Sequence, residues 1–517
     1  MGPERKLFCL GIALGLFLYL AAAPLTAVAD TDLPLPRMQT VQLGESTSVR
    51  AWPLVIIGSD NHPAAGLQEK EAPSQIASMT APYPANKEEV PTSPPAKQNP
   101  STSDLFGPRG GYLHPFLGIR EEYTDNVYNI DVDKVENFLT TVSTGAWLSA
   151  PRLKEVPASI APHNAAVAGM RYSVPASGSF ERFQTYLLGA LDYKTYSTES
   201  DLDYTAWHLE GMYQQNLPAG ISFRVRDRYT RDQDRFDIGS FQLQDFIVEP
   251  GGISVRSTPS QIRDYISNQA IFSTHLEFGE RFSAMFNFIN FFLDYEDDKD
   301  EWLDRTDNSL GLTLSYKYSP KTSFFIEYDR AVISYSADTP NDSQDSFFFG
   351  GINWQGSAKT SLIAKGGYQL KQYDIEDNED SDTFTMEAQL NYLITDKTKI
   401  GFSLYRAMEE TDSLRNRGMV STAARLRYDQ RISYRIQGGI ELGFEENDYD
   451  GFDPTVPVFL PEEARLDTRY LVRPSLHYFF RDWLVGELSY TFEDRNSTDT
   501  YYDFTSNTFF FSINAAF

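Results

Sequence analysis

Apolar and polar residues alternate along most of the chain. In one run Leu310, Leu312 and Leu314 are separated by small or polar residues, and in another Ile440 and Leu442 flank a glutamate. A period of two places neighbouring side chains on opposite faces of a β-strand. The pattern therefore predicts an all-β protein whose strands each have one apolar and one polar face.

The connections between these runs alternate between short and long. Short ones such as 319–322 and 395–398 carry turn-forming residues, whereas long ones such as 374–382 and 445–463 are acidic. Strands of soluble proteins usually have about 5–6 residues, but tilted strands that cross a bilayer need about 9–11. Transmembrane barrels also join their strands by short periplasmic turns and long outer loops. The fold that we predict is a transmembrane antiparallel β-barrel.

Eighteen strands follow from marking each alternating run back from the C-terminus. A weaker run, Ala165–Val174, is left out because both ends of such a barrel lie in the periplasm and the count is even. Sixteen and twenty strands remain alternatives. The predicted strands are 112–125, 138–149, 181–196, 204–216, 219–230, 264–277, 281–295, 306–318, 321–335, 344–355, 360–374, 382–394, 398–410, 418–429, 432–446, 467–480, 483–494 and 505–517.

The N-terminus has the features of a secretory signal peptide. Arg5 and Lys6 precede the apolar run Leu7–Ala23, and an Ala-Val-Ala sequence ends at Ala29. A positive start, an apolar core and small residues at the cleavage site predict export and removal of residues 1–29. An uncleaved anchor helix is the alternative. The only cysteine, Cys9, lies inside this apolar run, so disulfide frameworks and cysteine-based metal sites are excluded.

Residues 30–111 differ from the rest of the chain because they are rich in proline, and Pro, Ser, Thr, Ala and Gln dominate from Glu71 to Ser103. Such a composition buries too little apolar surface to offset the entropy of chain ordering. We therefore expect a flexible, disordered periplasmic segment at 30–111, followed by the barrel at 112–517.

The last residues of the chain alternate back from a terminal aromatic residue. Phe509, Phe511, Ile513 and Phe517 form the apolar set. This ending resembles the signal by which bacterial outer-membrane proteins reach the barrel-assembly machinery. The resemblance implies that this machinery is a partner of the chain.

Two short motifs near the start of the predicted barrel are more specific. The first contains Tyr123, Thr124, Asp125 and Asn126, and the second spans 138–145. Together they resemble the outer-membrane β-barrel porin family found in exopolysaccharide and exosortase loci. That family usually has proline where the second motif has threonine. The resemblance implies an outer-membrane location and export of a secreted polymer, and it supplies no catalytic residues.

Charge excludes one class of partner and describes the loops. The chain has 72 Asp and Glu against 45 Lys and Arg, a net charge of −27. A nucleic-acid-binding protein would need a basic surface, so we expect no nucleic-acid partner. Most of the surplus lies in the long loops, where divalent cations could bridge to lipopolysaccharide. The loop that begins at Asp448 lacks the final glutamate of a calcium-binding loop, and we predict no specific metal site.

The polar strand faces supply candidate pore-lining residues. Charged side chains on a lipid-facing surface would cost a few kcal/mol each near the bilayer centre, so an inward position is favoured. Such charges could create a transverse field in the lumen, or they could simply pair with one another. The candidates are Arg224, Arg226, Arg228, Arg425, Arg427, Arg435, Glu441, Arg469, Arg473 and Glu487, together with the facing carboxylates Glu210, Glu327, Asp329 and Glu387.

Catalysis has little support in the sequence. The six histidines lack zinc-ligand spacing, and no nucleophile elbow or phosphate-binding loop occurs. His208 with Glu210, and His275 with Glu277, share a strand face, but this is the ordinary result of a polar barrel interior. We expect no enzyme activity and no cofactor.

These observations predict a passive outer-membrane channel for hydrophilic solutes or for an extruded polysaccharide. The alternative is a structural or binding barrel that anchors an exopolysaccharide export system through residues 30–111. The expected surroundings are outer-membrane lipid and lipopolysaccharide. Polysaccharide and export components are further candidate partners.

Overall fold

The computed structural model describes most of the predicted barrel. The described residues are 112–150, 183–217, 220–234, 262–337, 341–357, 359–374, 380–411, 416, 418–450, 465–481 and 483–516. The predicted signal peptide, the proline-rich segment 30–111, the weak run Ala165–Val174 and the terminal Phe517 lie outside the described residues.

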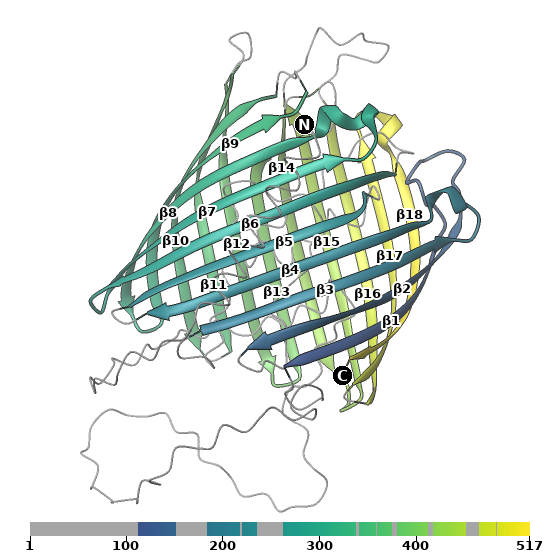
Figure 1. Cartoon of the computed structure of the whole chain (residues 1–517), viewed down its shortest axis with the longest axis horizontal. Helices are drawn as coiled ribbons and strands as arrows, with labels where there is room; N and C mark the ends of the chain where they lie inside the picture. The colour runs from purple at the N-terminus through teal and green to yellow at the C-terminus, as the bar shows by residue number, and fades with distance from the viewer. Residues whose placement is uncertain are drawn as a thin grey trace, which may run out of the picture.

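Eighteen antiparallel strands form a closed barrel (Figure 1). Each strand pairs with the next along the chain, and β1 pairs with β18 to close the sheet. The predicted fold class and strand number are therefore confirmed. The strands are β1 (Leu113–Thr124), β2 (Asn137–Ala150), β3 (Phe183–Tyr196), β4 (Tyr204–Leu217), β5 (Ile221–Asp234), β6 (Arg263–Phe278), β7 (Phe282–Tyr295), β8 (Arg305–Ser319), β9 (Thr322–Tyr335), β10 (Ser343–Ser357), β11 (Thr360–Tyr373), β12 (Ser381–Thr395), β13 (Thr398–Glu409), β14 (Gly418–Arg431), β15 (Ile436–Asp450), β16 (Leu466–Arg481), β17 (Leu484–Ser497) and β18 (Phe504–Ala516).

Three short 3₁₀ helices lie in those connections between strands that the structure describes. They are η1 (Ser200–Leu202), η3 (Asp298–Leu303) and η4 (Thr500–Tyr502). No helix in the described part of the chain is long and apolar enough to cross a bilayer.

The alternation of the sequence separates an inner and an outer face. On β4, His208 and Glu210 are buried, whereas Trp207 and Leu209 between and beside them are each 48% exposed. On β18, Phe509, Phe511 and Ile513 of the proposed assembly signal are also exposed. Apolar side chains therefore cover the outside of the barrel, where lipid would bury them.

Aromatic side chains pair across neighbouring strands on this outer face. Rings at adjacent register positions lie close enough to stack or tilt against each other, which stabilises strand pairing. Such pairs include Tyr123 with Phe138 (ring centroids 4.9 Å apart), Tyr328 with Phe348 (4.8 Å) and Tyr490 with Phe509 (4.8 Å).

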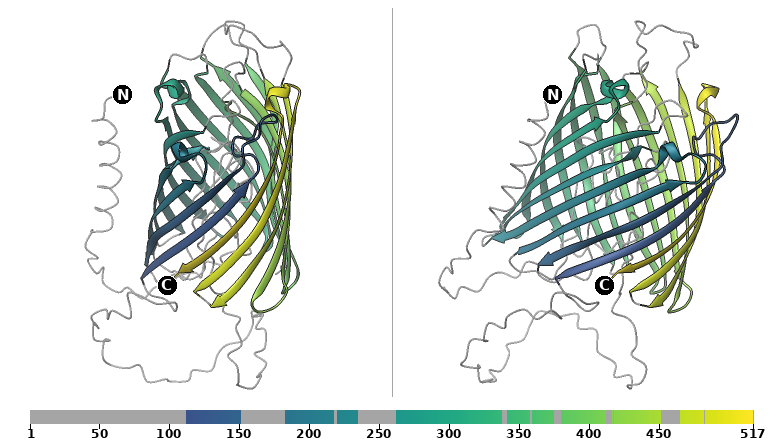
Figure 2. Two further views of the ribbon diagram at one scale, coloured as in Figure 1. Left: turned by 90° about the vertical axis from the view of Figure 1, so that its right-hand side faces the viewer. Right: turned by 45° about the vertical axis from the view of Figure 1, so that its right-hand side comes forward.

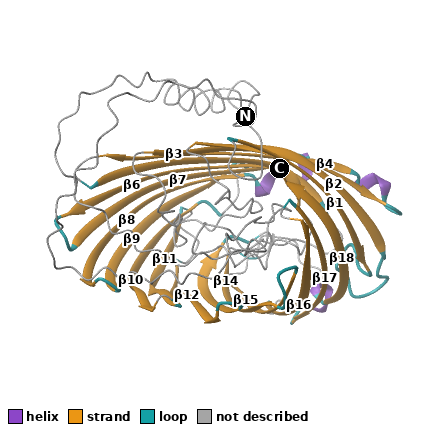
Figure 3. Ribbon diagram, turned by 90° about the horizontal axis from the view of Figure 1, so that it is seen from below, coloured by secondary structure: helices purple, strands orange, loops and turns teal. Residues whose placement is uncertain are grey.

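The described short turns, such as 319–322 and 395–398, lie at one end of the barrel, and the described connections that contain η1, η3 and η4 lie at the other (Figure 2). The C-terminus lies at the end with the short turns, the end that the barrel pattern places in the periplasm (Figure 1). Two of these turns contain Gly220 and Gly279, whose φ angles of 74° and 64° lie in the region that glycine adopts without strain. Seen along the barrel, the wall is oval rather than circular (Figure 3).

The predicted strand 432–446 is wrong at its start, because β15 begins at Ile436. The amides of Ile432 and Ser433 both donate to the carbonyl oxygen of Ile436, at 2.9 and 3.1 Å, so the chain reverses here. Arg435 therefore lies in the turn and not on the barrel wall. Its guanidinium lies 5.2 Å from the ring centroid of Tyr434.

The Tyr-Thr-Asp-Asn motif lies at the seam between β1 and β18. Asp125 accepts hydrogen bonds from the backbone amide of Asn507 at 2.8 Å and from its side-chain amide at 2.7 Å. Asn126 donates to the carbonyl oxygen of Thr505 at 2.9 Å. Tyr123 donates to Glu136 at 2.9 Å. The motif thus joins the first and last strands, which no hairpin connects.

Candidate functional site: the inner wall of the barrel

The remaining predicted pore-lining residues lie on inward-facing strand positions. They occupy the same face as buried neighbours, as Arg224, Arg226 and Arg228 do on β5. Arg435 is the exception, since it lies in the β14–β15 turn. The structure places these side chains on the inner face. That they line a conducting path remains a prediction.

Glu210 on β4 is the centre of one inner-wall cluster. Its carboxylate pairs with Arg226 (Nη2–Oε1 2.8 Å) and with Arg228 (Nε–Oε2 3.1 Å), both on β5. Tyr186 on β3 donates its hydroxyl to the same carboxylate. All four side chains are buried. The strand register explains the cluster, because it sets Glu210 directly opposite Arg228. A carboxylate with several charge-assisted hydrogen bonds holds both arginines in fixed positions.

Arg224 lies two residues before Arg226 on the same face of β5 and donates to a different residue. Its Nε and Nη2 atoms donate to the side-chain oxygen of Gln214, at 3.0 and 2.8 Å. It is half-buried. Its guanidinium brings a positive charge to this part of the inner wall.

His208, on the same strand face as Glu210, lies near two carboxylates. Its Nε2 atom is 3.8 Å from Asp192 and 3.9 Å from Asp232. Asp232 is also paired with Lys194. Among the described residues, no group of His, Cys, Asp or Glu side chains is arranged to hold a metal ion.

Lys365 on β11 is the centre of a second cluster, which the sequence reasoning missed. Its Nζ lies 3.1 Å from Glu327 on β9 and 2.9 Å from Glu387 on β12. It also lies 4.2 Å from the ring centroid of Phe349. The sequence contains a signal for this cluster, because Lys365 lies on the polar face of the alternating run that forms β11.

A third cluster surrounds Lys371, nearer to the longer loops. Lys371 pairs with Glu410 and lies 3.8 Å from Asp345. Tyr335 donates to Glu410 at 2.7 Å, and Gln369 donates to Asp345 at 3.1 Å. Side chains from several strands are thus tied together on the inner wall.

The predicted arginines of β14 and β16 also have polar partners on the inner wall. Most of these partners are carboxylates on a neighbouring strand or two positions along the same strand. The contacts join Arg425 to Glu441 (3.2 Å), Arg427 to Asp429 (2.9 Å), Arg469 to Glu493, and Arg473 to the hydroxyl of Thr491 (2.8 Å).

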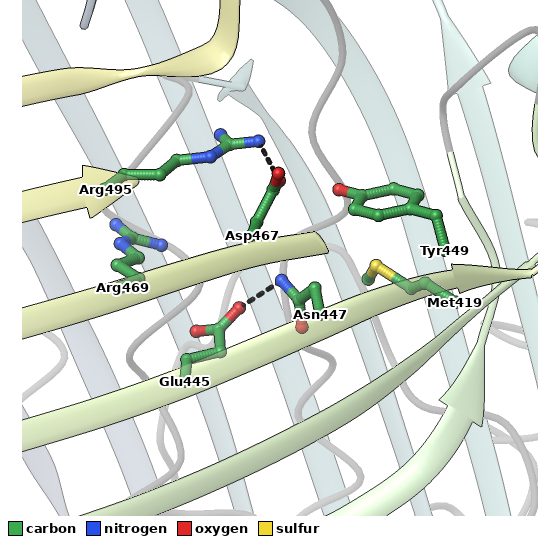
Figure 4. Close-up of a pocket in the computed structure, with 7 residues that line it drawn as sticks. All are labelled: Met419, Glu445, Asn447, Tyr449, Asp467, Arg469 and Arg495. Atoms are coloured by element: carbon green, nitrogen blue, oxygen red, sulfur yellow. Dashed lines mark hydrogen bonds and ion pairs between the residues drawn. The ribbon is translucent and has the colours of Figure 1, made fainter. Parts of the chain in front are cut away.

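A small recess opens among β14–β17 on this wall (Figure 4). Asp467 pairs there with Arg495, and Glu445 accepts a hydrogen bond from Asn447 at 2.8 Å. Asp467 also pairs with Arg465 at 2.7 Å. The other residues that line the recess are Met419, Tyr449 and Arg469.

Formal charge is unevenly distributed around the wall. The buried charged residues of β3–β6 are three cations and two carboxylates, and those of β8–β13 are three cations and six carboxylates. The first set is Arg226, Arg228, Arg263, Asp192 and Glu210; the second is Arg305, Lys365, Lys371, Asp307, Glu327, Asp329, Asp345, Glu387 and Glu409. One side of the barrel is therefore more basic and another more acidic, although most of these charges are paired.

Residues 296–517 match the family described as "Putative beta-barrel porin 2". No curated protein matches the sequence of the chain. Among solved structures, the chain is similar to the outer membrane protein OpdK from Pseudomonas aeruginosa, with 10% identity, a TM-score of 0.40 and coverage of 78% of this chain and 99% of that one. It is also similar to OccAB4 of Acinetobacter baumannii (8%, 0.38, 79% and 100%) and to the siderophore receptor PirA from Pseudomonas aeruginosa (9%, 0.35, 78% and 80%).

Proposed function

We propose that this chain, whose residues 296–517 match the model of a β-barrel porin family, is a passive channel of the outer membrane for hydrophilic solutes. The observation that carries the proposal is the contrast between the two faces of the closed barrel. The outside is apolar, and the inside carries charged residues on nearly every strand. An eighteen-strand barrel has a backbone diameter of about 35 Å, which side chains alone do not fill.

The inner-wall charges suit a channel that favours polar, hydrated solutes. Ion pairs such as those of Glu210 and Lys365 keep polar atoms on the wall in fixed positions. The more basic β3–β6 wall and the more acidic β8–β13 wall create a field across the lumen, which orients dipolar solutes. Hydroxyl-rich chains, including an extruded polysaccharide, fit the same lining because they exchange hydrogen bonds with paired charges at little cost. The proposed activity is transport and not catalysis.

Conductance of single barrels in a planar bilayer tests the proposal. The full-length chain and a chain lacking 30–111 are refolded and inserted separately. Steady, ohmic channels from either form support an open pore. Absence of steady channels from both forms, with barrels shown to be folded by heat-modifiable migration, would refute it.

Ion selectivity sharpens this test through Arg224. Exchange of Arg224 for Glu reverses a charge on the inner wall, at a residue that donates to the side-chain oxygen of Gln214. We expect the reversal potential in a salt gradient to move toward cation selectivity. Lys321→Glu is the matched control, because the same charge change then lies in the short turn between β8 and β9. An equal shift in both variants would mean that Arg224 does not face the conducting path.

The alternative function, anchoring an export system, depends on residues 30–111, which lie outside the described residues. Signal-peptide removal, the barrel-assembly machinery and polysaccharide export components likewise remain proposals for this chain. Lipid and lipopolysaccharide are the surroundings that an outer-membrane barrel has.

A further inference from the structure

The outer face of β4–β8 carries a diagonal row of small and polar side chains. We call this row the outer polar stripe, and Figure 1 shows its strands side by side. Each member lies between inward-facing neighbours, so its own side chain points toward lipid. The stripe consists of Gly211, Asp227, Asn268, Ala270, Asn290 and Asn308.

Asp227 is the most unusual member of the stripe. It lies six residues above the turn end of β5, between the outward-facing Val225 and Tyr229. Its register partners are Gly211 and Ala270. Its carboxylate accepts one hydrogen bond, from Asn268 at 2.9 Å. No cation pairs with it among the residues that the structure describes. A carboxylate at this depth in hydrocarbon is costly unless another group approaches it.

The rest of the stripe permits close approach of a second protein surface. Asn290 donates to Asn308 at 3.0 Å, which leaves further amide donors and acceptors on both side chains. Gly211 and Ala270 beside Asp227 have little side-chain bulk. Small residues next to polar ones are typical of protein contacts inside membranes, where close backbone approach and hydrogen bonds drive association.

The complementary charge is present elsewhere on the same outer face. Arg330 lies eight residues above the turn end of β9, at a depth similar to that of Asp227. Its guanidinium donates to Ser346 at 3.1 Å and to Gln344, both neutral. No carboxylate pairs with it in the described part of the chain. Strands β5 and β9 are four strands apart in the sheet, so the two charges cannot meet within one barrel.

We propose that the outer polar stripe docks a second copy of this chain, and that Asp227 of one barrel pairs with Arg330 of its neighbour. Each barrel supplies one charge at each of two different faces. Such a head-to-tail contact generates a ring when the rotation between neighbouring copies closes. Four of eighteen strands correspond to about 80° around a barrel, which suits a small ring of three or four copies. The ring does not depend on whether each lumen conducts.

Charge reversal tests the pairing. Asp227→Arg and Arg330→Asp are made singly and together, and the mass of the assembly is measured by native mass spectrometry from lipid nanodiscs. We expect the unaltered chain to assemble, each single variant to weaken assembly by roughly tenfold or more, and the double variant to recover it. Arg406→Asp is the matched control, since Arg406 is an outer-face arginine of β13 that also bonds a neutral partner, Thr422, at 2.6 Å.

Heat-modifiable migration shows whether each variant forms a barrel. If Asp227→Arg does not fold, Asp227→Asn replaces it, and the same weakening is expected from loss of charge alone. A chain that is monomeric in nanodiscs at every protein concentration would overturn the proposal. So would assembly that is unchanged in the Asp227 variants, or that is lost in Arg406→Asp and kept in Arg330→Asp.

Discussion

Strand β5 carries charged residues on both of its faces, and the charges on the two faces have different partners. On the inner face, Arg226 and Arg228 share the carboxylate of Glu210, which also accepts a hydrogen bond from Tyr186. On the outer face, Asp227 has only the amide of Asn268 in the described structure. The inner charges obtain their partners from the same barrel. The outer charge is best explained by a partner that the barrel does not contain.

This difference has an energetic consequence. A buried ion pair brings little net stability, because desolvation offsets attraction, but removal of one partner leaves a buried charge without compensation. The inner wall should therefore be sensitive to single changes and tolerant of matched ones. The outer polar stripe should behave differently in an isolated barrel. Replacement of Asp227 should increase stability there, because it removes the free-energy cost of a carboxylate in lipid.

The largest effect should follow from Glu210→Leu. The change leaves Arg226 and Arg228 buried beside each other, and we expect the free energy of unfolding to fall by about 3–5 kcal/mol. Urea unfolding in lipid vesicles, followed by tryptophan fluorescence, measures it. The control replaces Glu210, Arg226 and Arg228 together by Met and should recover most of the loss. A single variant that loses under about 1 kcal/mol would contradict the view that the inner wall is self-contained.

A smaller loss, of about 2 kcal/mol, is expected from Lys365→Met, because Glu327 and Glu387 then face each other without their shared cation. Protonation of one glutamate relieves the repulsion, so the loss should be greater at pH 8 than at pH 5. Unfolding measured at both pH values checks this, with Lys321→Met in a solvent-facing turn as the control. A pH-independent loss would mean that the lysine contributes by packing alone.

The strands themselves could be predicted because alternation is a local property of each strand. The prediction failed at residues 432–435, where Ile432 and Tyr434 continue the alternation through a turn. Hydrogen bonds to the carbonyl oxygen of Ile436 decide the matter there, and no hydropathy pattern contains them. Periodicity identifies which residues share a face and does not identify where the chain reverses.

Partners on the inner wall could not be predicted, because they depend on register between strands. That Glu210 lies opposite Arg228, and Glu387 opposite Lys365, requires the offset of each hairpin to be known. The lipid-facing position of Asp227 could have been predicted from the sequence. The outward set that begins with Phe223 and Val225 reaches Asp227 at its next position, which would have marked it as a lipid-facing carboxylate.

Asp227→Leu tests the outer half of the comparison in an isolated barrel. In an Arg330→Asp background, which should prevent assembly, we expect the free energy of unfolding to rise by about 1 kcal/mol, because a lipid-facing carboxylate is replaced by an apolar side chain. The same urea experiment measures the change. Val225→Leu, one outward position below, is the control and should be nearly neutral. A fall in stability for Asp227→Leu would show that the carboxylate already has a stabilising partner within its own barrel.

The smallest effect concerns a carboxylate outside the membrane, where water can respond to charge. Burial, together with the neighbouring Asp294, raises the pKa of Asp304, in the β7–β8 loop, to about 7. Its Oδ1 accepts a hydrogen bond from the backbone amide of Tyr295 at 2.7 Å, and the adjacent Leu303 packs in the cluster that includes Phe291. The folded loop therefore prefers the protonated acid.

The direction of the pH effect follows from that preference. Between the ordinary pKa of 3.8 and about 7, the folded loop binds a proton that the opened loop has released, so its stability falls as the pH rises. Protection of the amides at 298–304 from hydrogen exchange, corrected for the intrinsic rate, should decrease from pH 5 to pH 8. Asp304→Asn keeps the acceptor oxygen for Tyr295 and removes the ionisation, so its protection should not change with pH. If both chains lose protection equally, the titrating group lies elsewhere. Burial of the Asp304 carboxylate without a cation would then have no detectable free-energy cost at the aqueous rim, in contrast to the cost we expect for Asp227 in lipid.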